Sequence, residues 1–130
     1  MLMWLVILAR VGYLFSLCTE EKALEILRDS SVLPLLSFYP VGMRDVEKYL
    51  IDEDALLVVM PKDKEVEVHI AAKYRSRASI REALEIGIKW LKQRGFSRIV
   101  TTAPDERKAL VNLLKSLGFC KDGERWIIWA

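Results

Sequence analysis

Residues 69–87, HIAAKYRSRASIREALEIG, decide the fold, because they contain the end of a strand, a basic turn and the start of a helix. The strand is EVEVHIAA at 65–72, where polar and apolar side chains alternate as they do along a half-buried strand. Ser79, followed three residues later by Glu82, forms a capping box that predicts the start of the helix. We therefore expect a strand, a turn and a helix in succession.

The rest of the chain supplies further elements around this unit. Helical spacing and end signals predict helices over 19–30, 43–52, 80–94 and 105–119, and apolar runs predict strands over 55–60, 97–104 and 124–130. A strand, a helix and a second strand between residues 65 and 104 imply a right-handed crossover with parallel strands. We expect one domain over residues 1–130, of the α/β (α+β) class, with a mixed central sheet flanked by helices in three layers.

Composition excludes several classes of function. The chain has 130 residues and a net charge of +2, which is too small a basic excess to predict nucleic-acid binding. Its two cysteines and one histidine do not have metal-ligand spacing, so we expect no metal site. No disulfide framework is present either, and we expect a reducing compartment.

The first 18 residues, MLMWLVILARVGYLFSLC, are strongly apolar. Arg10 and Gly12 interrupt the run, which is shorter than a membrane-spanning helix requires, and no basic segment precedes it as in a secretory signal. We expect a buried strand or strand pair here and no contact with a membrane.

The turn KYRSRAS, at 73–79, delivers the strand to a helix N-terminus. Free backbone N–H groups and the helix dipole favour an anion at such a place, and Lys73, Arg75 and Arg77 add positive charge. Phosphate-binding turns usually contain glycine, and this turn has none. A solvated basic turn capped by Ser79 is the alternative.

Glu67 and His69 are the candidate general bases. Strand alternation places them on one face, where either side chain is able to take a proton from an amine. The alternative is an ordinary polar strand face, with His69 held by structural hydrogen bonds. Cys120 is predicted to be a small buried residue.

Trp126 and Trp129 lie three positions apart in the last strand. On a strand this spacing puts the two side chains on opposite faces, so that one of them is a candidate contact surface.

Residues 66–119 resemble the core of the GNAT acyltransferase superfamily, in the run VHIAAKYRSRASIREALEIGIKWLKQRGFSRIVTTAP and the later KALVNLLKSLGF. Arg75 matches the first position of that superfamily's pyrophosphate loop, Ala78 stands where its first glycine belongs and Ile80 stands at its last position. A frequent asparagine falls at Arg107, and a frequent tyrosine acid falls at Leu114.

The resemblance implies a GNAT-like fold, acetyl-CoA as acyl donor and an amine as acceptor. It places the thioester between two splayed strands, with the base at Glu67 or His69 and the thioester carbonyl at backbone N–H groups of Ile70 to Ala72. The implied cofactor-binding residues are Ile70, Ala71, Ala72, Arg75, Ser76, Arg77, Ala78, Ser79 and Ile80.

Three short motifs narrow the resemblance to GNAT-like proteins of tailed phages: LRDSSVLPLLS at 27–37, EVHI with YRSRA at 67–78, and TTAP at 101–104. Some of these proteins serve in virion or head assembly, so the resemblance implies a location in the cytoplasm of the host cell or in the virion. The alternative function is therefore a catalytically degenerate assembly protein that binds other virion subunits or itself. A toxin-like or regulatory partner protein with the same fold is a third alternative.

Overall fold

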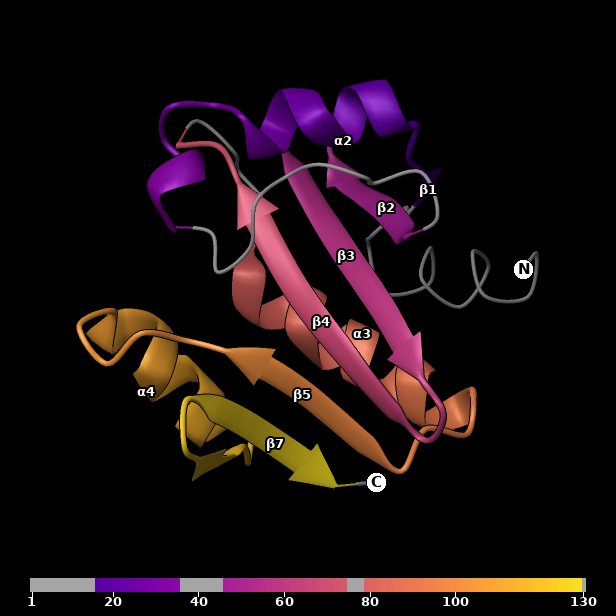
Figure 1. The fold of residues 1–130 in the computed structure, drawn as a ribbon, viewed down its shortest axis with the longest axis vertical. Coiled ribbons are helices and arrows are strands. Elements are labelled where there is room, and N and C mark those ends of the chain that lie inside the picture. Colours follow the sequence, from indigo (N-terminus) through magenta and orange to yellow (C-terminus); the bar gives the residue numbers. More distant parts are fainter. Residues whose placement is uncertain (1–15, 36–45, 75–78, 130) are drawn as a thin grey trace.

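The computed structural model describes residues 16–35, 46–74 and 79–129. In chain order the elements are β1 (Ser16–Leu17), α2 (Glu20–Leu27), a 3-10 turn η1 (Leu33–Leu35), β2 (Glu47–Asp52), β3 (Ala55–Lys62), β4 (Glu65–Ala72), α3 (Ile80–Gln93), β5 (Arg98–Thr102), α4 (Lys108–Ser116), β6 (Cys120–Asp122) and β7 (Arg125–Trp129) (Figure 1). The expected strand, turn and helix around residue 75 are thus β4 and α3.

Within the described residues, seven strands form one mixed sheet in the order β1-β2-β3-β4-β5-β7-β6. β2, β3 and β4 form an antiparallel meander, and β7 is antiparallel to both β5 and β6. β4 and β5 are parallel, with α3 as the crossover between them, as the sequence predicted. The α/β fold class is therefore confirmed.

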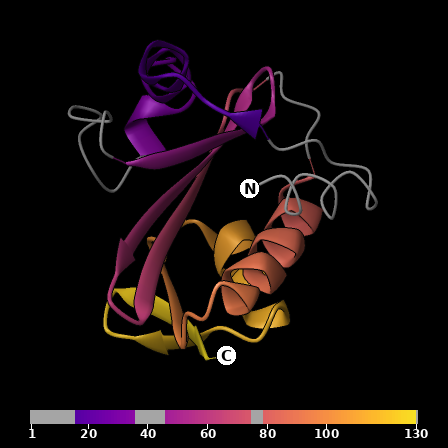
Figure 2. The ribbon, with the colours of Figure 1, turned by 90° about the vertical axis from the view of Figure 1, so that its right-hand side faces the viewer.

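The helices cover the two faces of the sheet. α2 packs on one face, over a cluster that contains Leu56, Val58 and Ala71. α3 and α4 contribute Leu91 and Leu114 to the larger cluster on the other face. Figure 2 shows the sheet between α2 and these two helices, which is the predicted three-layer arrangement.

The ends of the helices follow the capping signals. Thr19 Oγ1 accepts a hydrogen bond from Lys22 N–H at the start of α2, and Ser79 Oγ accepts one from Glu82 N–H at the start of α3. Gly95 and Gly118 follow α3 and α4 with φ angles of 97° and 98°, the left-handed conformation that ends many helices.

The prediction of a helix over 43–52 is wrong, because Glu47–Asp52 form β2. Tyr49 and Ile51 point into the larger cluster, while Leu50 packs against the α2 cluster. The side chains of β2 thus alternate between the two faces of the sheet. Pairing with β3 outweighs the intrinsic helix propensity of the segment.

Three predictions near the chain ends have different outcomes. Cys120 is exposed, not buried, because an additional short strand, β6, places it at the edge of the sheet. Trp126 and Trp129 do lie on opposite faces, with 3% and 58% of their surfaces exposed. The predicted N-terminal strand falls mostly outside the described residues, and Ser16–Leu17 form the short strand β1.

A polar and aromatic cluster fixes the end of α3 against β2. Arg94 donates hydrogen bonds of 2.7 and 3.1 Å to the Glu47 carboxylate, and its guanidinium lies 4.8 Å from the ring centre of Trp90. Tyr49 donates a hydrogen bond to Glu47 and meets Trp90 edge to face. Burial and this hydrogen bond raise the pKa of Tyr49 to about 12.

None of the helices within the described ranges is long and apolar enough to cross a membrane.

Glu47→Gln is predicted to lower stability in a pH-dependent way. Burial alone would raise the pKa of Glu47, but the hydrogen bonds from Arg94 and Tyr49 outweigh it and hold that pKa below its ordinary value of 4.5. The stabilisation is therefore present at neutral pH and is lost as the pH falls through the lowered pKa. Urea unfolding should show a loss of about 1 kcal/mol at pH 7 that shrinks below pH 4.5.

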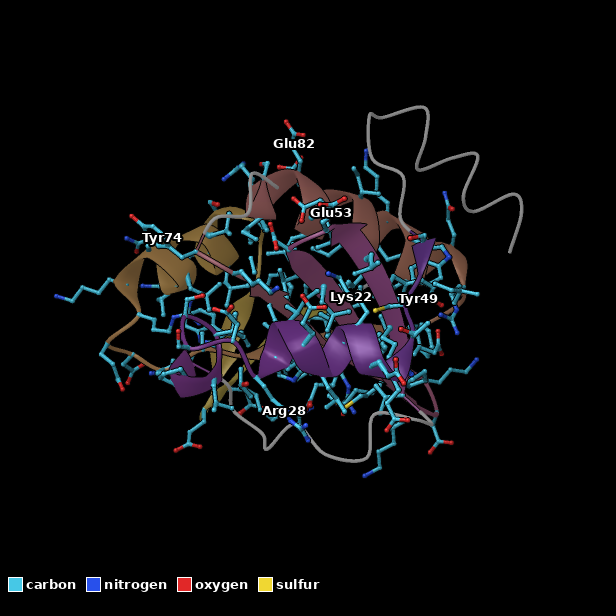
Figure 3. The ribbon with its side chains drawn as sticks, turned by 90° about the horizontal axis from the view of Figure 1, so that it is seen from above. Lys22, Arg28, Tyr49, Glu53, Tyr74 and Glu82 are labelled. Atoms are coloured by element: carbon cyan, nitrogen blue, oxygen red, sulfur yellow. The ribbon has the colours of Figure 1, made fainter. Side chains whose placement is uncertain are left out.

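Glu53→Gln is the matched control, because Glu53 is exposed in the turn between β2 and β3 (Figure 3). It should leave the free energy of unfolding nearly unchanged at either pH. A pH-independent effect of Glu47→Gln would contradict the assignment.

Candidate functional site

The two central parallel strands part soon after they meet. β4 and β5 pair at Glu65 with Arg98, Val66 with Ile99 and Glu67 with Val100, and the ladder stops there. β4 continues to Ala72 along β3 alone. Among the described parts of the chain, no strand therefore pairs with this edge of β4 over its last five residues, and its backbone groups there can bind a ligand or solvent.

A cavity of about 160 Å³ lies where the strands part. Its wall combines residues 68–72 of β4 with the end of β5, the start of α3, the inner face of α4 and Val32 beyond α2. Both faces of β4 contribute to it, since His69 and Ala71 point to the α2 side whereas Val68 and Ile70 point to the other. A cavity with such a wall lies at the open edge of the strand, between the two layers of helices.

Backbone alternation indicates which amides point into this gap. Lys73 N–H donates to the Asp54 carbonyl, 2.8 Å away, on the β3 side of the strand. Neighbouring residues of a strand point their N–H groups in opposite directions, so the N–H groups of Ile70 and Ala72 point toward β5. Of the three predicted carbonyl-binding residues, Ile70 and Ala72 thus have this direction, and Ala71 has the opposite one.

Glu67 and His69 lie on one face of β4, as their spacing predicted. His69 Nε2 is 2.9 Å from Glu67 Oε2. The His69 side chain is 11% exposed and lines the cavity, whereas Glu67 is 41% exposed and does not. The geometry therefore gives the two residues different positions, with the imidazole at the cavity and the carboxylate behind it.

The end of β4 is fixed by three contacts, one to the turn between β2 and β3 and two to the α2 side. Lys73 N–H donates to Asp54 O, and the buried Lys73 ammonium donates to Glu25 Oε1 at 2.8 Å. Tyr74 N–H donates to Ser31 Oγ, 3.0 Å away. Figure 3 shows Tyr74 at the outer surface, where its ring is 94% exposed. The chain therefore leaves β4 from a defined point, directly before the predicted phosphate-binding turn.

The turn itself lies largely outside the described residues. Arg75, Ser76, Arg77 and Ala78 belong to the undescribed segment, and their predicted role stays a prediction. The residues on either side of the segment are placed: Ser79 caps α3, and Ile80, its first residue, lines the cavity.

The wall contributed by β5 and α4 was not predicted as part of the site. It consists of Thr101, Thr102, Pro104, Arg107, Leu110 and Leu114. Arg107, Leu110 and Leu114 have the spacing i, i+3, i+7, which places them on one face of the helix and is the signal that would have found them. Leu114, at the position of the resembling family's tyrosine, is fully buried and provides no acid.

The described residues contain no group of three or more side chains with the chemistry of a metal site. Within this part of the chain, His69 and Arg107 are the ionisable side chains that line the cavity. The cavity thus places one imidazole and one guanidinium among Val, Ile and Leu side chains.

Comparison with known proteins relates this geometry to acetyltransferases. No family model matches the chain, and no curated protein matches it by sequence. Solved structures do match. The spermidine N-acetyltransferase of Vibrio cholerae, in complex with CoA and spermine, superposes with a TM-score of 0.71 at 9% identity, over 88% of this chain and 95% of that chain.

Two further solved structures give the same result. The ribosomal-protein-alanine N-acetyltransferase of Brucella melitensis matches with a TM-score of 0.68 at 13% identity, over 90% of this chain and 99% of the other. A probable acetyltransferase of the GNAT family from Chromobacterium violaceum matches with a TM-score of 0.70 at 13% identity, over 88% and 86%. The chain therefore has the GNAT acetyltransferase fold.

Proposed function

We propose that the chain is an N-acyltransferase that moves an acetyl group from acetyl-CoA to an amine. The observation that carries the proposal is the position of His69, in the wall of a cavity at the parted strands and hydrogen-bonded to Glu67 behind it. The fold supports it, since the spermidine N-acetyltransferase with the same fold was solved with CoA and spermine.

The described residues fit the acyl-carrying arm of acetyl-CoA. The cavity is open along one strand edge and is lined mainly by apolar side chains, among them Val68, Ile70, Leu84 and Leu110. An extended, uncharged arm with amide groups suits such a wall, because strand-edge backbone groups pair with its amides in the way that an added strand does.

Each polar group of the site then has one role. One of the two N–H groups that point into the gap, that of Ile70 or that of Ala72, holds the thioester carbonyl and stabilises the negative charge that develops on its oxygen. His69 takes a proton from the attacking amine. The Glu67 carboxylate lies 2.9 Å from His69 Nε2 and orients the imidazole. Glu67 is thus a positioning residue.

The transfer forms an amide C–N bond, breaks the C–S bond and moves one proton from the amine to the sulfur. Leu114 occupies the position of the resembling family's tyrosine acid and has no proton to give. His69 therefore both receives the proton of the amine and returns it to the departing sulfur.

Two more specific predictions from the sequence concern a phage-type group and an assembly role. Membership of a phage-type group and a role in virion assembly rest on the short motifs alone, and the structures compared above are acetyltransferases. The contact surface that the assembly hypothesis needs has one described candidate, Trp129, which lies over Arg98 with 5.4 Å between the ring centre and the guanidinium carbon. No described contact gives this surface a particular occupant.

Calorimetric titration with acetyl-CoA tests the proposal directly. We expect one-to-one binding in the micromolar range that adenosine does not reproduce. Thiol release from acetyl-CoA should then be measured with a polyamine and with a peptide that has an N-terminal alanine, the two kinds of acceptor named for proteins of this fold. A folded protein that binds no acetyl-CoA at millimolar concentration would overturn the proposal and favour the assembly role.

His69→Gln is predicted to lower kcat by roughly 10²- to 10⁴-fold, the usual contribution of a general base, without weakening acetyl-CoA binding. Glu67→Gln should lower kcat less and shift the pH profile of kcat, because it changes the orientation and charge environment of the imidazole. Steady-state kinetics between pH 6 and 9, combined with calorimetry, measure both effects.

Glu65→Gln is the matched control for Glu67→Gln. Glu65 lies two residues earlier on the same face of β4 but is bound to Arg98 and Arg125, outside the cavity. It should change stability and leave the pH profile unchanged. Equal effects of the Glu65 and Glu67 variants on the profile would contradict the positioning role.

The double variant Arg75→Ala/Arg77→Ala is predicted to abolish acetyl-CoA binding and to leave folding intact, because it removes the two charges of the basic turn. Calorimetry and thermal unfolding measure the two results. Lys62→Ala/Lys64→Ala removes the same charge at the turn between β3 and β4, at the opposite end of β4, and should bind normally. Unchanged binding in the Arg75/Arg77 variant would remove the phosphate role from this turn.

A further inference from the structure

Arg107 is a cation in the wall of an otherwise mostly apolar cavity. It directly precedes α4 and lies on the same helix face as Leu110 and Leu114. Its backbone is fixed, since Arg107 N–H donates to the Pro104 carbonyl at 3.0 Å and Arg107 O accepts from Val111 N–H at 3.0 Å. The side chain therefore starts from a defined place on the cavity wall.

The charge of Arg107 is not used by other residues that the structure describes. No ion pair or side-chain hydrogen bond connects it to them. The nearby Asp105 is bound to Lys121 at 2.9 Å, and Glu106 is exposed. A guanidinium that is partly buried beside leucines loses hydration, and a partner of opposite charge would compensate for this loss.

The position of Arg107 along the cavity indicates which part of a ligand it meets. The inner end of the cavity is where β4 and β5 part, at Val68 and His69. The outer end is at the last residue of β4, Ala72, where Ile80 begins α3, because the register of the parallel strands puts Thr102 level with His69. Beyond Thr102 the chain continues through Pro104 to Arg107, and both line the cavity, whereas Leu114 lies two helical turns away from Arg107, about 10 Å along α4. We therefore infer that Arg107 lies toward the outer end.

We propose that Arg107 binds the pyrophosphate of the acyl carrier from the α4 side of the cavity, opposite the start of α3. This inference rests on the proposed function and adds a residue to its donor site. With the thioester at His69, the uncharged arm fills the apolar part, and its phosphates emerge at the outer end. Arginine provides planar, two-pronged hydrogen bonding to phosphate, and its charge compensates for a turn without glycine.

The test compares two neighbouring cations on the same helix end. Arg107→Gln should weaken CoA binding by roughly ten- to a hundredfold in calorimetry, as expected for the loss of charge-assisted hydrogen bonds. Arg107→Lys should recover part of that loss, because it restores the charge without the planar fork. Lys108→Gln removes the same charge from an exposed neighbour outside the cavity, and should change the dissociation constant less than twofold.

Ligand variants identify the phosphate concerned. Dephospho-CoA keeps the pyrophosphate and lacks the 3′-phosphate, so Arg107→Gln should weaken its binding by the same factor as for CoA. Acetyl-pantetheine has no phosphate, and the wild-type chain and Arg107→Gln should bind it equally, as measured by ligand-detected NMR at millimolar concentration. A loss seen with CoA alone would assign Arg107 to the 3′-phosphate and overturn the proposal.

The two proposals fail in different ways. A folded wild-type chain that binds neither CoA nor dephospho-CoA would overturn the proposed function together with the role of Arg107. A wild-type chain that binds CoA, with Arg107→Gln binding it equally tightly, would overturn the role of Arg107 alone. Equal losses in the Arg107 and Lys108 variants would show a general effect of charge and would also overturn it.

Discussion

The parting of β4 and β5 after Glu67 and Val100 is the constraint on which the rest of the structure depends. A parallel pair that continued to the strand ends would satisfy the backbone groups of residues 68–72 and leave no space between the strands. Because the pair ends early, these groups require another partner. The same divergence brings side chains from both faces of the sheet to one cavity, which a continuous sheet cannot do.

A divergent pair of strands needs support on both sides. On the α2 side, the buried Lys73 ammonium is bound to Glu25 and Tyr74 N–H to Ser31 Oγ, so the end of β4 is fixed to the α2 layer. On the other side, the Arg94–Glu47 pair fixes the end of α3 to β2, far from the cavity. Polar contacts of the α2 layer therefore fix β4 at one end of the gap, while mostly apolar side chains line the gap itself.

Local signals predicted much of this arrangement. The capping box at Ser79, the alternation of 65–72 and the glycines after α3 and α4 are properties of short segments, and each was confirmed. The segment 43–52 was misread because its side chains contact both faces of the sheet, and only the partner strand β3 reveals that environment. Cys120 was misread for a similar reason, since the edge position of β6 depends on a pairing distant from the residue itself.

The site shows the same division between local and distant information. The pair of Glu67 and His69 was predicted from strand spacing, but the sequence did not separate their positions, because the cavity that contacts only His69 is completed by β5 and α4. Those elements also explain why a leucine at position 114 is compatible with the proposed acyl transfer. In that proposal His69 lies at the inner end, where a proton leaves the amine and is needed by the sulfur, and Arg107 is placed toward the outer end, near the phosphates. A cavity with one group that exchanges protons and one fixed cation, separated along its length, requires no third ionisable side chain for the proposed reaction.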